Sequence, residues 1–250
     1  MDRRFRLRER LKSYDLGRPE SKRRYNRKLF AAVSGRYGAA RRILSFGLDS
    51  AWKRRLLRLL PAGGSPRILD LACGTGEMTA ALARRYPRGR IVGMDLSGPM
   101  LRRARRYHRG ESDNLRFLSG DMNRIPFPEG SFDAVSGGYA LRNAPDLEQT
   151  LGEIHRILVP GGRAVFLEFS ASPYPSLREL QLRLLGWWGS LWGLLLHHNP
   201  EVYRYLAESL RRFPDRRGLD EMLKGRGFHV VRSRSLFFSL LRLTLCRKDA

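Results

Sequence analysis

The stretch Ile68-Leu69-Asp70-Leu71-Ala72-Cys73-Gly74-Thr75-Gly76 decides the fold. A short apolar run of strand length leads directly into a glycine-rich bend, and helix-forming residues follow to about Tyr86. Glycine allows a ligand to approach the backbone closely. We therefore predict a strand, a ligand-binding loop and a helix in succession.

The same alternation continues along the chain. Further strands are predicted at residues 91–95, 115–118, 132–136 and 163–169, with helices between most of them. Strands that alternate with helices at this spacing form a parallel, doubly wound sheet, whose ligands bind at the carboxyl ends of the strands. With two more strands near the C-terminus, we expect an α/β fold with a mostly parallel seven-stranded sheet and a helical cap.

Composition excludes several classes of protein. The 250 residues are 42% apolar, which is typical of a globular chain with a core and not of a disordered one. No apolar run reaches the roughly 18–20 residues that a bilayer span needs, and no secretory signal is evident. Two cysteines are too few for a disulfide framework, and the five histidines lack metal-ligand spacing. We expect a cytoplasmic protein without a metal site.

The formal charge of +24 is unevenly distributed. Residues 1–60 carry a net +14, whereas residues 61–170 are nearly neutral at +3. A basic surface of this kind is typical of proteins that bind an anionic membrane or a nucleic acid. A solvated helical face is the simpler explanation, and the charge alone does not decide between them.

The chain divides into five segments on these patterns. We expect a basic N-terminal arm at 1–28, a helical cap at 29–65, a cofactor-binding core at 66–170, an apolar helical insertion or substrate lid at 171–215, and strands that complete the sheet at 216–250.

Residues 184–196 are the most apolar stretch and contain three of the four tryptophans. Thirteen residues are too few to cross a bilayer. A buried helix is the simpler interpretation, and it is favoured by the apolar composition. An apolar lid or an interfacial patch is the alternative, since indole rings suit the boundary between hydrocarbon and water.

Two aspartates follow successive predicted strands and indicate a nucleoside pocket. Asp95 lies 19 residues after Gly76, where a carboxylate can accept both hydroxyls of an adenosine ribose. Asp121 follows the next strand, within reach of an adenine amino group. Glu77 at the helix start disfavours a pyrophosphate, so a ligand without phosphate fits better than a dinucleotide.

This arrangement resembles the class I S-adenosylmethionine-dependent methyltransferases over about residues 66–170. The resemblance implies a Rossmann-like fold and S-adenosyl-L-methionine as the cofactor. The residues that would bind it are Asp70, Ala72, Gly74, Thr75, Gly76, Asp95, Leu96, Asp121, Met122 and Gly138.

A narrower resemblance extends from about Phe30 to the C-terminus. It is carried by Leu44-Ser45-Phe46-Gly47-Leu48, Pro126-Phe127-Pro128, Leu141-Arg142-Asn143, Leu167-Glu168-Phe169-Ser170 and Tyr203-Arg204-Tyr205-Leu206-Ala207-Glu208-Ser209-Leu210. These motifs are similar to those of the ubiquinone/menaquinone biosynthesis C-methyltransferase family. The resemblance implies methylation of a ring carbon on a polyprenylated quinol, either a benzoquinol or a naphthoquinol.

The Arg142-Asn143 pair carries over as the catalytic element, with Tyr139 and Tyr203 as substrate-binding candidates. A guanidinium stays protonated in proteins, so Arg142 is a poor general base. We expect it to stabilise the phenolate form of the quinol, or to orient a water that takes the proton.

The chain departs from the family pattern on the substrate side. The family usually shows Tyr-Asp-x-x-Asn where this chain has Tyr37-Gly38-Ala39-Ala40-Arg41, and it often has His where this chain has Asp49. It also shows Phe-Gly-Leu-Arg-Asn where this chain has Tyr139-Ala140-Leu141-Arg142-Asn143. These changes put the acceptor in doubt, while the cofactor half is intact.

Three alternatives stay open at this point: a methyltransferase acting on RNA, one acting on another lipid or small molecule, and an inactive cofactor-binding partner of a membrane complex. Nucleic acid is disfavoured because Gly137-Gly138-Tyr139-Ala140 lacks the acidic-proline-proline-aromatic pattern of amino-directed base methyltransferases. We expect a peripheral protein at the inner face of an anionic membrane, where a prenylated substrate resides. The sequence leaves a homodimer, the ring type and the tail length undecided.

Overall fold

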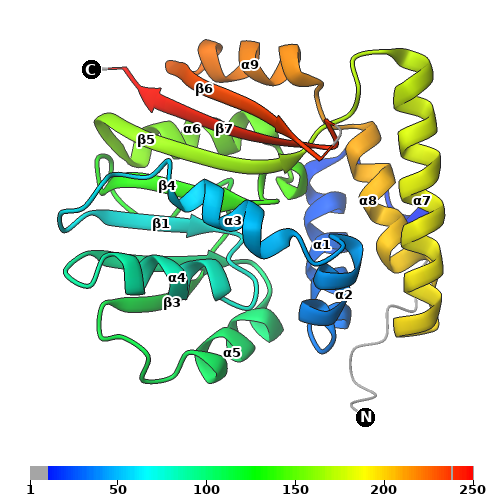
Figure 1. Cartoon of the computed structure of the whole chain (residues 1–250), viewed down its shortest axis with the longest axis horizontal. Coiled ribbons are helices and arrows are strands. Elements are labelled where there is room, and N and C mark those ends of the chain that lie inside the picture. Colours follow the sequence, from blue (N-terminus) through cyan, green and yellow to red (C-terminus); the bar gives the residue numbers. More distant parts are fainter. Residues whose placement is uncertain (1–10, 238, 250) are drawn as a thin grey trace.

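Seven strands form one sheet in the order β3-β2-β1-β4-β5-β7-β6 (Figure 1). The structure, a computed structural model, describes residues 11–237 and 239–249, apart from the side chain of Lys12. The first five strands are parallel, and β7 runs antiparallel to both its neighbours, which confirms the predicted sheet. The strands are β1 (Arg67–Leu71), β2 (Arg90–Asp95), β3 (Leu115–Ser119), β4 (Phe132–Gly138), β5 (Leu158–Phe169), β6 (Phe228–Leu236) and β7 (Leu241–Lys248).

Helices cover both faces of the sheet. Successive residues of a strand point to opposite faces, so Ile68 of β1 packs in the cluster that includes α3 and α4, and Leu69 packs in the cluster that includes α6 and α9. Such two-sided burial explains why the central strands are apolar at almost every position. The flanking helices are α3 (Asp49–Leu57), α4 (Glu77–Arg85), α5 (Gly98–Tyr107), α6 (Leu147–Ile157) and α9 (Arg216–Gly225).

Four more helices lie beyond the carboxyl ends of the parallel strands and form the cap (Figure 1). They are α1 (Pro19–Val33), α2 (Tyr37–Leu44), α7 (Pro175–His197) and α8 (Glu201–Arg211). Tyr25 and Leu29 of α1 pack with Val202 and Tyr205 of α8 in a third apolar cluster. The cap therefore joins segments from both ends of the chain.

Two predicted boundaries differ from the structure. The division between a basic arm and the cap at residues 28 and 29 falls inside α1, which runs unbroken from Pro19 to Val33, and residues 1–10 of the arm lie outside the described residues. The strand predicted at 163–169 begins earlier, at Leu158; within this added part of β5, Gly161 adopts a φ of +70° and the register with β4 shifts. Local glycines there bend a strand without ending it.

Helix α7 is the apolar stretch for which burial is the simpler interpretation, and the structure overturns that interpretation. Its side toward α8 is made of small residues: a Cβ on Gly189 would lie 2.6 Å from the Tyr203 carbonyl oxygen, and one on Gly193 would lie 2.6 Å from that of Asn199. Glycine at these points permits a close approach of the two backbones. The opposite side stays exposed at large apolar residues, namely Leu177, Leu180, Leu184, Trp187, Leu194 and Leu195. Within the described part of the chain, no helix is both long and apolar enough to span a bilayer.

Candidate functional site

Two neighbouring cavities lie between the carboxyl ends of the parallel strands and the cap. The first has an empty volume of about 640 Å³, and the second about 740 Å³, each including space open to solvent. Volumes in this range suit a small-molecule ligand. Four residues line both cavities and form their common wall, namely Phe30, Tyr37, Tyr139 and Asn143.

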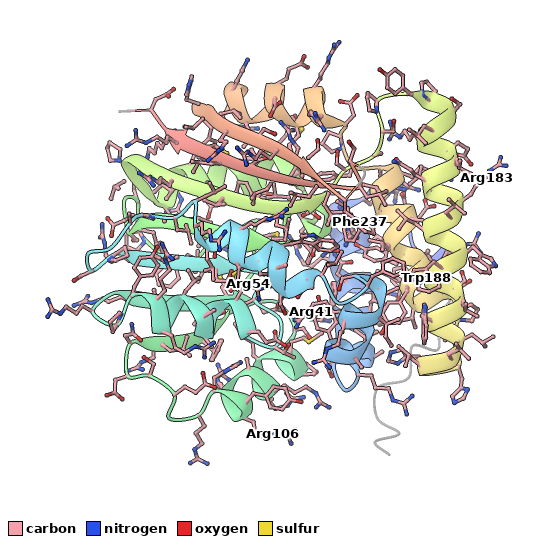
Figure 2. All side chains as sticks on the ribbon, in the orientation of Figure 1. Arg41, Arg54, Arg106, Arg183, Trp188 and Phe237 are labelled. Carbon is pink, nitrogen blue, oxygen red and sulfur yellow. The ribbon has the colours of Figure 1, made fainter. Side chains whose placement is uncertain are left out.

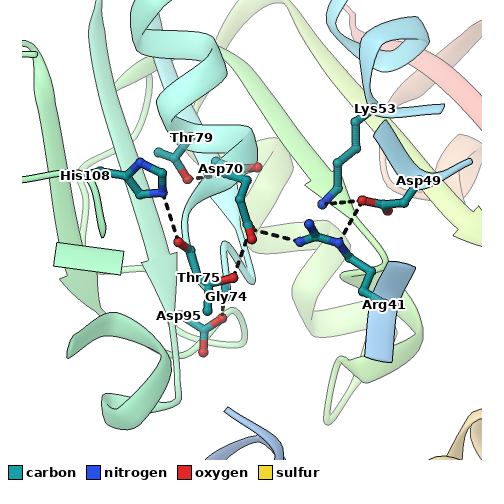
Figure 3. A network of polar contacts seen from close by, with 10 residues as sticks. Arg41, Asp49, Lys53, Asp70, Gly74, Thr75, Thr79, Asp95 and His108 are labelled. Atoms are coloured by element: carbon teal, nitrogen blue, oxygen red, sulfur yellow. Dashed lines mark hydrogen bonds and ion pairs between the residues drawn. The ribbon is translucent and has the colours of Figure 1, made fainter. Parts of the chain in front are cut away.

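The first cavity is built on the glycine loop and on Asp95. One carboxylate oxygen of Asp95 accepts the Gly74 N–H at 2.8 Å (Figure 3). The other accepts the Ser97 N–H at 2.7 Å. Burial raises the pKa of Asp95, while these two amide hydrogen bonds oppose the rise. The carboxylate thus ties the loop after β1 to the loop after β2 and leaves lone pairs for a ligand.

Most of the predicted cofactor residues line this first cavity. Ser97, Met100 and Asn26 line it too, although the sequence motifs did not single them out. The predicted residues on its wall are Ala72, Gly74, Asp95, Leu96, Asp121, Met122 and Gly138.

Three predicted cofactor residues are not among the wall residues of this cavity. Asp70 is buried under the loop, where its two oxygens accept hydrogen bonds from the hydroxyls of Thr79 and Ser136, each at 2.7 Å. The Thr75 hydroxyl donates to Glu77, and the Thr75 carbonyl contacts His108 at 3.1 Å. The structure therefore gives these side chains internal partners that hold the loop in shape.

Gly76, the third, begins α4 in the left-handed conformation with a φ of +84°. A Cβ there would lie 2.7 Å from the Phe117 ring, so only glycine fits. Its contribution is to the turn itself.

Helix α1 covers the first cavity on the cap side. Arg23 of α1 pairs with Asp121 at 2.6 Å, and the Asp121 carboxylate also accepts the Asn123 N–H at 2.9 Å. No motif in the sequence indicated that α1 reaches this loop, because the two residues are almost a hundred positions apart. A ligand amino group at Asp121 would share the carboxylate with Arg23.

The second cavity is largely apolar. The polar groups on its wall include Arg41, Ser45, Arg142 and Asn143. Apolar residues from α1, α2 and α8 make up much of the rest: Leu29, Val33, Ala40, Leu44, Val202 and Leu206.

Arg142 is held at the wall of this apolar cavity by a buried counter-charge. Its side chain is 7% exposed and lies 3.7 Å from the Glu168 carboxylate, which is itself 3% exposed. The guanidinium also donates to the Ser209 hydroxyl and lies over the rings of Phe169 and Tyr205, 5.6 and 5.8 Å from their centroids. A cation fixed in such a low-dielectric site interacts strongly with any nearby anion.

Burial raises the pKa of Glu168, while Arg142 and the backbone N–H groups of Arg142 and Phe169 oppose the rise. The pair is therefore mutually dependent: each charge is stabilised in the interior mainly by the other.

Asn143 links the common wall to the cap. The side-chain NH2 group of Asn143 donates to the backbone carbonyl of Tyr139 at 2.8 Å. The backbone carbonyl of Asn143 accepts a hydrogen bond from the Asn26 side chain at 2.8 Å. Tyr139 has a φ of +63°, which strains a residue other than glycine. These bonds hold the strained turn in place at the end of β4.

Tyr203 lines the second cavity, and its hydroxyl contacts Nε2 of His197 at 2.8 Å. His197, the last residue of α7, is partly buried against this tyrosine.

The first cavity fits S-adenosylmethionine by the chemistry of its wall. Three buried polar atoms of its wall residues, Asn26 Oδ1, Ser97 Oγ and Asn143 Oδ1, have no hydrogen-bond partner among the described residues. Buried polar atoms normally have partners, so a polar ligand is the natural complement. Leu96, Met100 and Met122 offer apolar contacts for an adenine ring, between the carboxylates of Asp95 and Asp121.

Residues 18–246 match the model of the ubiE/COQ5 methyltransferase family. The chain belongs to this family. It is therefore an S-adenosylmethionine-dependent C-methyltransferase of menaquinone or ubiquinone biosynthesis.

The relatives agree with this membership. A demethylmenaquinone methyltransferase of Thermus thermophilus is 40% identical over 206 residues, which cover 81% of this chain and 92% of the relative. A ubiquinone/menaquinone biosynthesis C-methyltransferase of Rubrivivax gelatinosus is 36% identical, over 86% of this chain and 83% of the relative. Among solved structures, one chain in the complex between the Haloferax volcanii Trm112 methyltransferase activator and a putative methyltransferase has a TM-score of 0.65 and 22% identity. The match covers 90% of this chain and 97% of that chain, and it concerns the fold.

The buried carboxyl of Asp70 predicts a pH dependence of stability. Burial raises its pKa from the ordinary 3.8 to about 6, against the hydrogen bonds from Thr79 and Ser136. The folded state thus holds the proton more tightly than the unfolded state, so the contribution of Asp70 to stability is fully present below pH 3.8 and is lost as the pH rises through about 6. Each unit of pKa shift corresponds to about 1.4 kcal/mol.

Urea unfolding of the wild type and of Asp70→Asn between pH 4 and 7 measures this effect. The free energy of unfolding of the wild type should fall relative to the variant as the pH rises. Asp133→Asn is the control, because hydrogen bonds from Arg67 lower the pKa of Asp133. The free energy of unfolding of the wild type should therefore not fall relative to this variant as the pH rises. A wild-type curve that stays parallel to that of Asp70→Asn would contradict the assignment.

Proposed function

We propose that the methyl acceptor is a reduced, prenylated naphthoquinol of the demethylmenaquinol type. The observation that carries the proposal is the common wall of Tyr139 and Asn143, which places an apolar cavity directly beside the cofactor cavity. A ring in the second cavity can then present a carbon toward the first, as an in-line methyl transfer requires.

The shape and chemistry of the second cavity support a prenylated ring. Its aliphatic wall residues on α1, α2 and α8, such as Leu29, Leu44 and Leu206, suit an isoprenoid tail. Aromatic residues at the ring end, Phe30, Tyr139 and Phe169, suit a flat bicyclic ring. The naming of the Thermus thermophilus relative as a demethylmenaquinone methyltransferase favours the naphthoquinol over the benzoquinol.

S-adenosylmethionine, when bound, supplies an electrophilic methyl group. The residues of this chain prepare the acceptor. The ring carbon is nucleophilic only when the neighbouring phenol oxygen is ionised, and the buried Arg142 cation stabilises that phenolate. Because Glu168 and Ser209 fix the guanidinium, it needs no reorganisation as charge develops.

Asn143 has a positioning role in this proposal. Its Oδ1 atom lacks a partner among the described residues and belongs to the wall between ring and cofactor. It can accept a hydrogen bond from a phenol or from the cofactor ammonium. The largely apolar surroundings reduce the solvation of the phenolate, which would otherwise lower its reactivity.

We further propose that the enzyme works as a peripheral protein on the inner face of an anionic membrane. The exposed apolar face of α7 supports this, with Trp187 66% exposed and Leu184 58% exposed. Arg183, which directly precedes Leu184 in sequence, points away from the helix, and its side chain is 76% exposed (Figure 2). An apolar face bordered by arginines in a chain of net charge +24 fits insertion among anionic headgroups.

Acceptor assays with methyl-labelled S-adenosylmethionine test the proposed substrate. Chemically reduced demethylmenaquinol should be methylated on its ring carbon, faster than a demethylated benzoquinol with the same tail. The oxidised quinone should be inert because it has no phenolate. RNA and phospholipid serve as acceptors of the other classes, and faster methylation of either would refute the proposal.

Replacement of Arg142 should separate chemistry from cofactor binding. Arg142→Gln should lower kcat by about 10²–10³, as loss of a charge-stabilising donor typically does. The affinity for S-adenosylhomocysteine, measured by calorimetry, should stay within about twofold, since Arg142 is not part of the first cavity. Arg142→Lys keeps the charge beside Glu168 and should retain an intermediate kcat.

Arg204→Gln, on the exposed side of α8, is the matched control for Arg142 and should leave both quantities unchanged. Equal losses of kcat and of cofactor affinity in Arg142→Gln would count against the assigned role.

Vesicle sedimentation tests the membrane proposal. The wild type should bind vesicles that contain phosphatidylglycerol more tightly than pure phosphatidylcholine vesicles, and added salt should weaken the binding. Leu184→Ser/Trp187→Ser should bind several-fold less tightly, because it removes apolar area from the exposed face of α7. Tyr107→Ser, at a 49% exposed aromatic on α5, is the control and should bind as the wild type does. Absence of the wild type from anionic vesicles at low salt would exclude this role.

A further inference from the structure

The residues that depart from the family pattern lie together in space. Arg41 Nε is 2.8 Å from Asp49 Oδ2, and Lys53 Nζ is 3.2 Å from the same oxygen (Figure 3). The charge of Asp49 also acts on Tyr139: burial, followed by this charge, raises the pKa of Tyr139 well above its usual range. Two of the substituted residues, Arg41 and Asp49, therefore form an ion pair with each other, and Asp49 pairs with Lys53 as well.

This cluster connects the cap to the glycine loop. Besides Asp49, Arg41 pairs with Glu77, the first residue of α4, at 2.9 Å. Lys53 lies beside the cofactor cavity, with its Cε 3.9 Å from the position of a Cβ on Gly138. The ion pairs thus join α2 of the cap to α3 and to the start of α4.

The charges in the cluster are too buried to be a solvated surface network. The side chains of Arg41, Lys53 and Asp49 are 19%, 15% and 4% exposed. A buried charge without its partner costs several kcal/mol, so substitution of one of these residues alone is unfavourable. This explains why Arg41 and Asp49 occur together where the family pattern has Asn and His.

Arg41 also reaches the acceptor side. It lines the second cavity, together with Tyr139 and Arg142. Its contacts with Asp49 and Glu77 use Nε and Nη1, and no partner of Nη2 is found among the described residues. A guanidinium has five N–H donors, so Arg41 retains donors for a ligand in this cavity.

We propose that Arg41 is a substrate-binding residue, which donates a hydrogen bond to the second ring oxygen of the quinol, and that Asp49 and Tyr139 position it. This inference rests on the proposed quinol acceptor. A hydroquinone has two oxygens on opposite sides of the ring, and the methylated carbon is next to one of them. Arg142 stabilises the oxygen beside the methylated carbon, and Arg41 binds the one across the ring.

The test uses an acceptor analogue that lacks the second ring oxygen, a prenylated naphthol. The wild type should use the full quinol at least about tenfold better in kcat/KM than the naphthol, as expected for a hydrogen bond from a charged donor. Arg41→Gln should lose about tenfold on the quinol and little on the naphthol, so that its preference disappears. If the role of Arg41 were purely structural, Arg41→Gln would lower kcat/KM equally for the quinol and for the naphthol.

Matched variants keep the test interpretable. Arg42→Gln, exposed on the same helix, should behave as the wild type. Arg41→Lys should keep part of the preference, and Tyr139→Phe should reduce it through a looser Arg41. Arg41→Asn/Asp49→His restores the family residues and leaves neither Arg41 nor Asp49 as a buried charge without its partner. This double variant should fold, bind S-adenosylhomocysteine as the wild type does, and show no preference for the quinol over the naphthol.

The outcomes separate the two proposals. If the wild type methylates neither the quinol nor the naphthol, the proposed acceptor is wrong. If it methylates the quinol but shows the same preference in Arg41→Gln and in the double variant, the acceptor is supported and the role of Arg41 is refuted.

Discussion

The whole site depends on one partly buried carboxylate, that of Asp95. Its two oxygens accept the N–H groups of Gly74 and Ser97, and so they fix two loops from neighbouring strands relative to each other. The cost of burying the charge is offset by these amide dipoles, which point at it from both sides. The pre-arranged loops leave a polar slot at the end of the sheet, where a nucleoside can bind without reorganisation of the backbone.

The acceptor side uses a different physical strategy. There the surroundings are largely apolar, and two cations are held in place by carboxylates. Arg142 depends on the buried Glu168, and Arg41 depends on the buried Asp49 and on the partly exposed Glu77. In such surroundings, each of these cations would act more strongly on the ring oxygen of the proposed acceptor than it would at the surface. Burial also makes the pairs intolerant of single changes, which is consistent with the joint replacement of Arg41 and Asp49.

Helix α7 shows how the cap accommodates an apolar substrate and an apolar surface together. Gly189 and Gly193 allow its backbone to lie against α8, whose other residues line the acceptor cavity. Several of its larger side chains, such as Leu184, Trp187 and Leu195, are directed outward, where they remain exposed, whereas Leu182 is buried. One helix thus supports the wall of the cavity and provides the apolar face that we assign to the membrane.

Local patterns in the sequence predict the succession of strands and helices along the chain, the glycine loop, and the acidic residues after the second and third strands. These signals are local because they follow strand and helix periodicity. These patterns were sufficient for the fold and for most of the wall of the first cavity. The tertiary structure was needed to show that Asp70 and Thr75 have internal partners, that α7 exposes an apolar side, and that Arg41 pairs with Asp49. These properties depend on contacts between residues far apart in the chain, and the distance between two such residues is set by packing, which no local pattern records.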